Sequence, residues 1–444
     1  MVTDLTKGSV TKKLVLFSVP LLISVAFQQL YNMVDSVVVG KYCGTNELAA
    51  VGASFPITML FVAIASGASV GASVVVSKIF GERDEPRLKT AITTSVILSL
   101  ALSAVLTAVG IIYCDPILEI LNTKPEIFAD SSVYMQIYIW GLSFVFIYNM
   151  CNGIFTALGD SVTPLALLIG SSLFNIVLDV VFVKSLGLAV KGVAAATFIA
   201  QGISSVIALV LLFYRLSKMG VLGQGRVFSV RMLGSVSRLA VPSVLQQSFV
   251  SVGNLLIQYL VNGFDANTVA GFSAAIKLNG FALTAFIALS NGLSSFTAQN
   301  IGARQTARVK RGYKAGLMMA ASIAVPFALV FALLGKYLML MFVSADETAV
   351  IETGSRFLLY VSPFYIIVAL KLITDSVLRG AGYIFGFVAT TFSDLIIRVA
   401  ISFVLVEMLN SVVGIYISWP IGWIISAVMS VLFYRFGGWR RKLA

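Results

Sequence analysis

GASVVVSKIFGERDEPRLK, at residues 71–89, returns in altered form as GLSSFTAQNIGARQTARVK at residues 292–310. The glycines and basic residues of the first stretch keep their spacing in the second. The matched pairs are Gly71 and Gly292, Gly81 and Gly302, Arg83 and Arg304, Arg87 and Arg308, and Lys89 and Lys310. Further pairs lie outward: Val19-Pro20 with Val241-Pro242, Asn32 with Asn254, and Leu212-Phe213-Tyr214-Arg215 with Leu432-Phe433-Tyr434-Arg435. The second half of the chain therefore repeats the first, about 220 residues later.

The composition places this repeat in a membrane. Of the 444 residues, 59% are hydrophobic and 11% are charged, whereas about a quarter of a soluble domain is charged. Apolar runs long enough to cross ~30 Å of hydrocarbon recur along the chain. We expect an all-α, polytopic membrane protein with twelve transmembrane helices, at about residues 14–39, 48–77, 92–114, 131–157, 163–184, 192–214, 236–262, 269–299, 313–343, 354–381, 384–408 and 412–436.

The number of apolar segments in each half predicts how the two copies are related. Each half holds about six, and an even number returns the chain to the side where it started, so both copies should enter the bilayer from the same side. Parallel repeats related by an axis along the membrane normal are typical of transporters. We expect a six-helix N-lobe at 1–222 and a six-helix C-lobe at 223–444, with the functional site between them.

The distribution of charge predicts the orientation. The net charge is +12, and most of the 31 lysines and arginines fall on one side if the N-terminus is cytoplasmic. The densest basic clusters run from Arg215 to Arg238, from Arg304 to Lys314 and from Arg435 to Lys442, whereas the loops on the other side are acidic. This positive-inside bias predicts a multi-pass protein of the plasma (inner) membrane with both termini in the cytoplasm. It argues against a nucleic-acid partner.

Two residue types bear on enzyme chemistry. Histidine is absent, which removes Ser-His and Cys-His nucleophile systems and the usual zinc and haem ligands. The three cysteines, Cys43, Cys114 and Cys151, show no paired spacing and predict neither a disulfide framework nor a metal cluster. We expect no enzymatic activity and no cofactor.

Two acids fall inside the predicted spans of the N-lobe, Asp35 in the first and Asp179 in the fifth. Asn175 precedes Asp179 by four residues and shares its helix face, and Thr197 lies at a similar predicted depth in the sixth span. Two carboxylates cannot both ionise cheaply in a low dielectric unless a proton or a cation neutralises them. Their oxygens suit a proton relay or a hard cation such as Na⁺. The alternative is that both acids are protonated and structural.

Pro20 lies inside the first span, fifteen residues before Asp35. Proline removes a backbone hydrogen bond and permits a kink. A helix-1 kink on the same helix as a titratable acid could have two states, although a static bend fits the sequence as well.

The C-lobe does not repeat the N-lobe acids. It offers a possible network of Lys277, Lys371, Asp375, Asp394 and Arg398. Lys371 with Asp375, and Asp394 with Arg398, are opposite charges four residues apart on predicted helices. These pairs would neutralise themselves in a structural or gating network, or they would take part in substrate binding or proton movement.

Together these features resemble the multidrug and toxic compound extrusion (MATE) family. The resemblance covers essentially the whole chain and rests on Val19-Pro20, Asp35, Asn175, Asp179 and Thr197, set in two parallel six-helix lobes. It implies a V-shaped pair of bundles around a central cavity that exports amphipathic, often cationic, compounds against inward H⁺ or Na⁺ flow. It also implies that the four polar residues form a proton or Na⁺ site and that Pro20 bends the first helix.

One departure concerns the branch of that family. The branch that resembles NorM carries an acid in helix 7 that works with an acid in helix 10. Here the span 236–262 has no acid, although Asp375 remains in the tenth span. The chain is therefore more similar to the DinF-like branch, where the N-lobe acids are central.

We therefore expect a secondary-active multidrug efflux antiporter that works by alternating access as a monomer in the lipid bilayer. Its substrates would be small amphipathic molecules, and its coupling ion H⁺ or Na⁺. The alternative is a flippase for lipid-linked saccharides or precursors, which would hold a pyrophosphate with several Lys or Arg residues. A membrane-embedded transferase or hydrolase fits the absence of histidine poorly. The substrate and the choice of ion stay open, because the same oxygen ligands suit both ions.

Overall fold

The computed structural model describes residues 3–42, 45–121, 123–223 and 225–439, with the backbone alone at 33–42 and 45–48. Every regular element in these ranges is a helix. The elements are α1 (Val10–Tyr42), α2 (Thr45–Glu82), α3 (Glu85–Ile112), α4 (Cys114–Ile120), α5 (Pro125–Trp140), α6 (Leu142–Ala157), α7 (Val162–Val180), η1 (Val181–Ser185), α8 (Ala189–Lys218), η2 (Val221–Gly223), α9 (Val230–Val261), α10 (Ala266–Gly302), α11 (Thr306–Met339), α12 (Thr348–Val361), η3 (Ser362–Phe364), α13 (Tyr365–Gly380), α14 (Ile384–Leu409) and α15 (Val413–Phe436).

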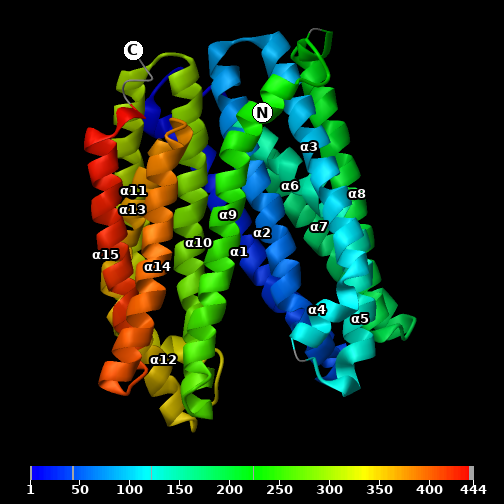
Figure 1. Ribbon diagram of the computed structural model, residues 1–444, viewed down its shortest axis with the longest axis vertical. Helices are drawn as coiled ribbons and strands as arrows, with labels where there is room; N and C mark the ends of the chain where they lie inside the picture. Colours follow the sequence, from blue (N-terminus) through cyan, green and yellow to red (C-terminus); the bar gives the residue numbers. More distant parts are fainter. Residues whose placement is uncertain (1–2, 43–44, 122, 224, 440–444) are drawn as a thin grey trace. The chain divides into compact units, whose positions relative to one another are not determined.

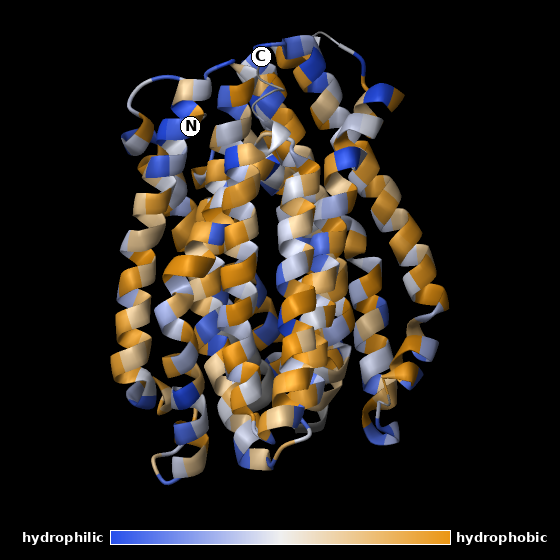
Figure 2. Cartoon of the chain, turned by 60° about the vertical axis from the view of Figure 1, so that its left-hand side comes forward, coloured by the Kyte–Doolittle hydropathy of each residue, from blue (hydrophilic) through white to orange (hydrophobic). Residues whose placement is uncertain are grey.

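The helices have the length and apolar surface of membrane spans. Within the described residues, ten helical segments are long and apolar enough to cross a bilayer, and α5 with α6 forms an eleventh that is bent by 48°. α14 has 26 residues, about 39 Å of helix, and its bounds match the span predicted at 384–408, although it is not among these apolar segments. Hydrophobic residues, in orange, cover most of the middle of the helices, and hydrophilic residues, in blue, gather toward both ends (Figure 2). The expected all-α, polytopic membrane fold is confirmed.

The chain forms two compact units. Unit 1 comprises Met1–Asp4 and Ile23–Gln247, and unit 2 comprises Leu5–Leu22 and Ser248–Ala444. The boundary passes through α1 and through α9, so the first part of each helix packs with the other half of the sequence. The lobe bounds 1–222 and 223–444, which follow from the sequence repeat, remain a prediction.

The repeat of the sequence is visible as a repeat of local structure. The turn between α2 and α3 places Arg83 at φ 62°, and the turn between α10 and α11 places Arg304 at φ 55°. Both residues occupy the left-handed region that L-amino acids with a side chain rarely adopt. In each turn this residue donates its N–H to the carbonyl three residues earlier, Phe80 in one copy and Ile301 in the other. The same tight reversal therefore closes the same helix pair twice.

Glycines at related positions allow two close helix crossings. In unit 1, a Cβ at Gly71 would lie 2.3 Å from Ala240 Cα, and one at Gly67 would lie 2.5 Å from Val244 Cα. In unit 2, a Cβ at Gly292 would lie 3.2 Å from Ser18 Oγ. The close approach expected of these small residues is therefore present, between α2 and α9 in one copy and between α10 and α1 in the other.

Asp265, in the loop before α10, is the N-cap residue of that helix. Asp265 accepts hydrogen bonds from the N–H groups of Asn267 and Thr268 at 3.0 and 3.1 Å and from the Thr268 hydroxyl at 2.7 Å. The Thr268 hydroxyl and backbone N–H lower the pKa of Asp265, because they stabilise the charged form. Its charge is satisfied locally by the start of the helix.

We expect Gly71→Ala to lower the free energy of unfolding by about 1–3 kcal/mol, because the added methyl group must displace the backbone of α9. Gly170→Ala is the matched control, since a Cβ there meets nothing within 4 Å. That change should be neutral or should stabilise α7 by up to ~1 kcal/mol. Denaturant unfolding of both purified variants in detergent tests the comparison. Equal stability of the two variants would show that α2 and α9 do not need the contact.

Candidate functional site

The N-lobe candidates lie at the end of α7. Asn175 and Asp179 sit one helical turn apart and are 3% and 0% exposed. Directly after Asp179 the helix widens into the π-helical segment η1. Such π-turns interrupt the regular hydrogen-bond ladder and occur often at functional sites. The backbone thus places a buried carboxyl group next to a local irregularity.

Asn175 joins three helices through its side chain. The orientation of its amide is set by its partners. In that orientation its NH₂ group donates to Asp179 Oδ2 at 3.2 Å, and its oxygen accepts from the backbone N–H of Thr197 in α8 at 3.3 Å. The hydroxyl of Tyr31 in α1 is a further partner of the same amide. All four residues belong to unit 1.

The structure therefore brings together three of the four predicted N-lobe residues. Thr197 contributes its backbone N–H to this contact, whereas the sequence suggested its hydroxyl. Asp35 lies in α1, four residues after Tyr31, but its side chain lies outside the described residues. The predicted proximity of the two aspartates therefore stays a prediction.

Tyr31 was not among the predicted ligands. Its position one turn before Asp35 on the same helix was the available signal. Side chains four residues apart share a helix face, so a hydroxyl there adds an oxygen to a site built from carboxyl and amide groups. Within the described residues no group of three or more His, Cys, Asp or Glu side chains could hold a metal ion. Among the described residues, the oxygens beside Asp179 belong to amide, hydroxyl and backbone groups.

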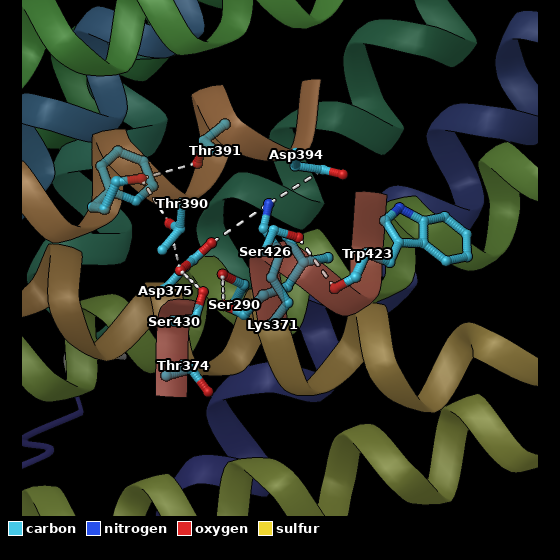
Figure 3. Close-up of polar contacts among 12 residues, drawn as sticks. Ser290, Lys371, Thr374, Asp375, Thr390, Thr391, Asp394, Trp423, Ser426 and Ser430 are labelled. Carbon is cyan, nitrogen blue, oxygen red and sulfur yellow. Dashed lines mark hydrogen bonds and ion pairs between the residues drawn. The ribbon is translucent and has the colours of Figure 1, made fainter. Parts of the chain in front are cut away.

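The C-lobe candidates form a buried ion cluster between α13, α14 and α15. Lys371 Nζ lies 3.5 Å from Asp375 Oδ2 and 3.5 Å from Asp394 Oδ2. Asp375 Oδ1 also accepts hydrogen bonds from Thr390 at 2.9 Å and from Ser430 at 2.6 Å. Figure 3 shows Lys371 between the two carboxylates, with Thr390 and Ser430 converging on Asp375. One ammonium group thus forms ion pairs with two acids.

Arg398 has a different environment from the one predicted. Asp394 pairs with Lys371, and no ion pair joins Asp394 to Arg398 among the described residues. The guanidinium of Arg398 lies over the ring of Trp419, 4.3 Å from its centroid. α14 and α15 run side by side here (Figure 1), and a Cβ at Gly422 would lie 2.9 Å from Asp394 Oδ1. Asp394 and Arg398 therefore lack the direct ion pair expected from their i,i+4 spacing, and the carboxylate pairs instead with Lys371 on α13.

Lys277 stands apart from this cluster. It is exposed on α10, and its ammonium lies 6.0 Å from the ring centroid of Phe342. Arg379 is a further buried base, not among the predicted site residues, and it donates to Asn291 Oδ1 at 2.8 Å and to Ser294 Oγ at 3.2 Å. Its place near the end of α13 made it resemble an ordinary cytoplasmic arginine.

Known proteins with similar sequences and structures are membrane transporters. The chain is 26% identical over 98% of its length to the probable multidrug resistance protein YpnP of Bacillus subtilis, 97% of which is covered. It is 27% identical over 82% of its length to an FAD transporter of Shewanella oneidensis, with 79% of that protein covered. A crystal structure of a MATE in complex with MaL6 shares the fold, with a TM-score of 0.91, 24% identity and 99% of each chain covered.

The family assignment rests on both copies of the repeat. The MatE family model matches residues 20–181 and again residues 242–404. The first match contains Pro20, Asp35, Asn175 and Asp179, and the second contains Lys371, Asp375, Asp394 and Arg398. The two matches cover most of the chain, and the chain therefore belongs to the MatE family of multidrug and toxic compound extrusion transporters.

Proposed function

We propose that this transporter is a secondary-active multidrug antiporter whose coupling ion binds in unit 1, at Asp179 and Asn175 with Thr197 and Asp35. The observation that carries the proposal is the fully buried carboxyl group of Asp179, hydrogen-bonded to the amide of Asn175 inside a membrane span. Ionisable groups at such depth are expensive, and they mark ion pathways in membrane proteins.

The chemistry of this site couples an ion to a conformation. An ionised Asp179 accepts hydrogen bonds only, whereas a protonated one also donates. Protonation, or a bound Na⁺, would therefore change which partners the carboxyl group favours. An ion drives transport only if it binds two conformations with different affinities, and this change of hydrogen bonding supplies such a difference.

The conformational element that we propose is α1, with Pro20 as its bend. The boundary between the two units passes through α1 after Leu22 and through α9 after Gln247, close to the repeat-related Pro20 and Pro242. Proline weakens the helix ladder at both places. Alternating access would use these two helices as hinges, and the site at Tyr31 and Asp35 lies on the same helix as Pro20.

The substrates that we propose are amphipathic, often cationic compounds. Support comes from relatives named multidrug resistance or multidrug export proteins. Another relative is named an FAD transporter, so family membership alone does not fix the cargo. H⁺ and Na⁺ both remain candidates for the coupling ion. The proposal includes a monomer of the plasma membrane with both termini in the cytoplasm, in the DinF-like branch.

The ion cluster of unit 2 has a structural role in this proposal. Lys371 already forms ion pairs with two carboxylates, so its ammonium group is not available to bind a pyrophosphate group. Arg379 is hydrogen-bonded to Asn291 and Ser294. A lipid-linked precursor flippase, the alternative expected from sequence, would need such bases for its anionic substrate. The cluster instead fixes α13 against α14 and α15.

We expect Asp179→Asn, and separately Asp35→Asn, to reduce gradient-driven efflux of a dye cation from proteoliposomes by at least about tenfold, because the coupling ion loses its carboxylate. A pH gradient and a Na⁺ gradient, each imposed alone, identify the ion. Asp346→Asn is the matched control, since that acid is exposed in the loop before α12. Unchanged efflux in both test variants would remove this site from the mechanism.

We expect Lys371→Met to lower the free energy of unfolding by about 3–5 kcal/mol, because two buried acids lose their shared cation. A triple variant, Lys371→Met with Asp375→Asn and Asp394→Asn, removes all three charges and should recover most of that loss. It should also retain dye efflux, because the cluster is structural. A folded triple variant without transport activity would instead place the cluster in the transport cycle.

A further inference from the structure

A cavity of about 380 Å³ opens between the start of α1 and the first turns of α11, within unit 2. One wall is the stretch from Gly8 to Thr11, and the other is the face of α11 that carries Arg308, Arg311, Lys314 and Met318. The cavity lies at the end of the helices that the positive-inside bias assigns to the cytoplasm. It is separate from the buried clusters of both units.

Arg308 holds the two walls of this cavity together by hydrogen bonds. Its two terminal nitrogens donate to the carbonyls of Gly8 at 2.7 Å and Leu5 at 3.0 Å, and its Nε donates to Asn300 Oδ1 at 3.0 Å. The side chain therefore clamps the segment before α1 onto the start of α11. Its three side-chain nitrogens all donate to protein oxygens. A ligand in the cavity would therefore interact with the other two basic side chains, Arg311 and Lys314.

Arg311 and Lys314 supply the positive charge of this cavity. Both are exposed, and no ion pair involves either of them within the described residues. The first turn of α1 faces the same cavity, and its N–H groups have no intrahelical acceptors. A helix start and two basic side chains together favour an anion with several oxygens, such as a phosphate group.

The first copy of the repeat shows that this cavity is not a simple consequence of the fold. The residues of α3 that correspond to Arg311 and Lys314 are Thr90 and Thr93, and both are buried. The linker between η2 and α9 contacts this face: Thr93 Oγ1 donates to Val227 O at 2.5 Å. The same linker is held again where Ser229 N–H donates to Thr94 Oγ1 at 3.3 Å. One copy therefore closes this helix face with hydrogen bonds, and the other leaves it open and basic.

Apolar side chains also line the cavity. Met318 lies one turn deeper than Lys314 on the same face of α11 and is 64% exposed. Basic residues at the cytoplasmic level with an exposed apolar side chain below them match a phospholipid, whose phosphate group is at the interface and whose acyl chains point inward. The geometry points to a binding site for the phosphate-bearing headgroup of an anionic phospholipid, held by Arg311, Lys314 and the start of α1.

Native mass spectrometry of the purified full chain in detergent, titrated with short-chain phosphatidylglycerol or phosphatidylcholine, tests this site. The wild type should hold one phosphatidylglycerol in preference to phosphatidylcholine. The double variant Arg311→Gln and Lys314→Gln should bind it roughly thirty-fold more weakly, since each base near a membrane surface adds about a factor of five. The control Arg304→Gln and Lys310→Gln removes two charges next to the cavity but outside its lining, and it should bind as the wild type does.

A second arm separates a lipid from a soluble anion. Inorganic phosphate at the same concentrations should not displace phosphatidylglycerol, because it lacks the acyl chains that lie against Met318. Displacement by phosphate at equal concentration would overturn the lipid assignment in favour of a soluble-anion site. Equal loss of binding in the test and control variants, or equal binding of the two lipids by the wild type, would overturn the site itself.

Discussion

A charged side chain inside a membrane span is costly, because the surrounding apolar groups solvate it poorly. Asp179 is fully buried in a span, and its charge state is set by the groups and ions that reach it. In unit 2 the same cost is reduced by Lys371, which lies between two carboxylates. In unit 1, Asp179 accepts a hydrogen bond from the amide of Asn175, and the proposed coupling ion would change the energy of this site when it binds.

The two copies of the repeat therefore share a backbone and differ in chemistry. The turns at Arg83 and Arg304 and the glycine crossings at Gly71 and Gly292 are common to both. Aligned by the repeat, Asp179 stands opposite Arg398, which stacks on Trp419. The basic cavity at α11 has hydrogen-bonded threonines as its counterpart on α3. The repeat gives both units a common scaffold, and the residues that differ between the copies give each unit its own polar groups.

Much of the fold could be predicted from sequence, because membrane spans are set by the length of apolar runs. The helical break between α5 and α6, and the division of α1 and α9 between the two units, depend on packing that hydropathy does not record. At the site, Asn175 with Asp179 followed from their spacing on one helix. Tyr31 joins them from another helix, and Asp394 pairs with Lys371 across helices, so neither contact has a sequence spacing to reveal it.

The most direct test of the central claim is ion release on substrate binding. Purified chain in detergent is mixed with a dye cation, and the H⁺ or Na⁺ released per bound dye is measured for the wild type and for Asp179→Asn. The account predicts release by the wild type and its loss in the variant, while the dye still binds. Equal release from both proteins would contradict the account.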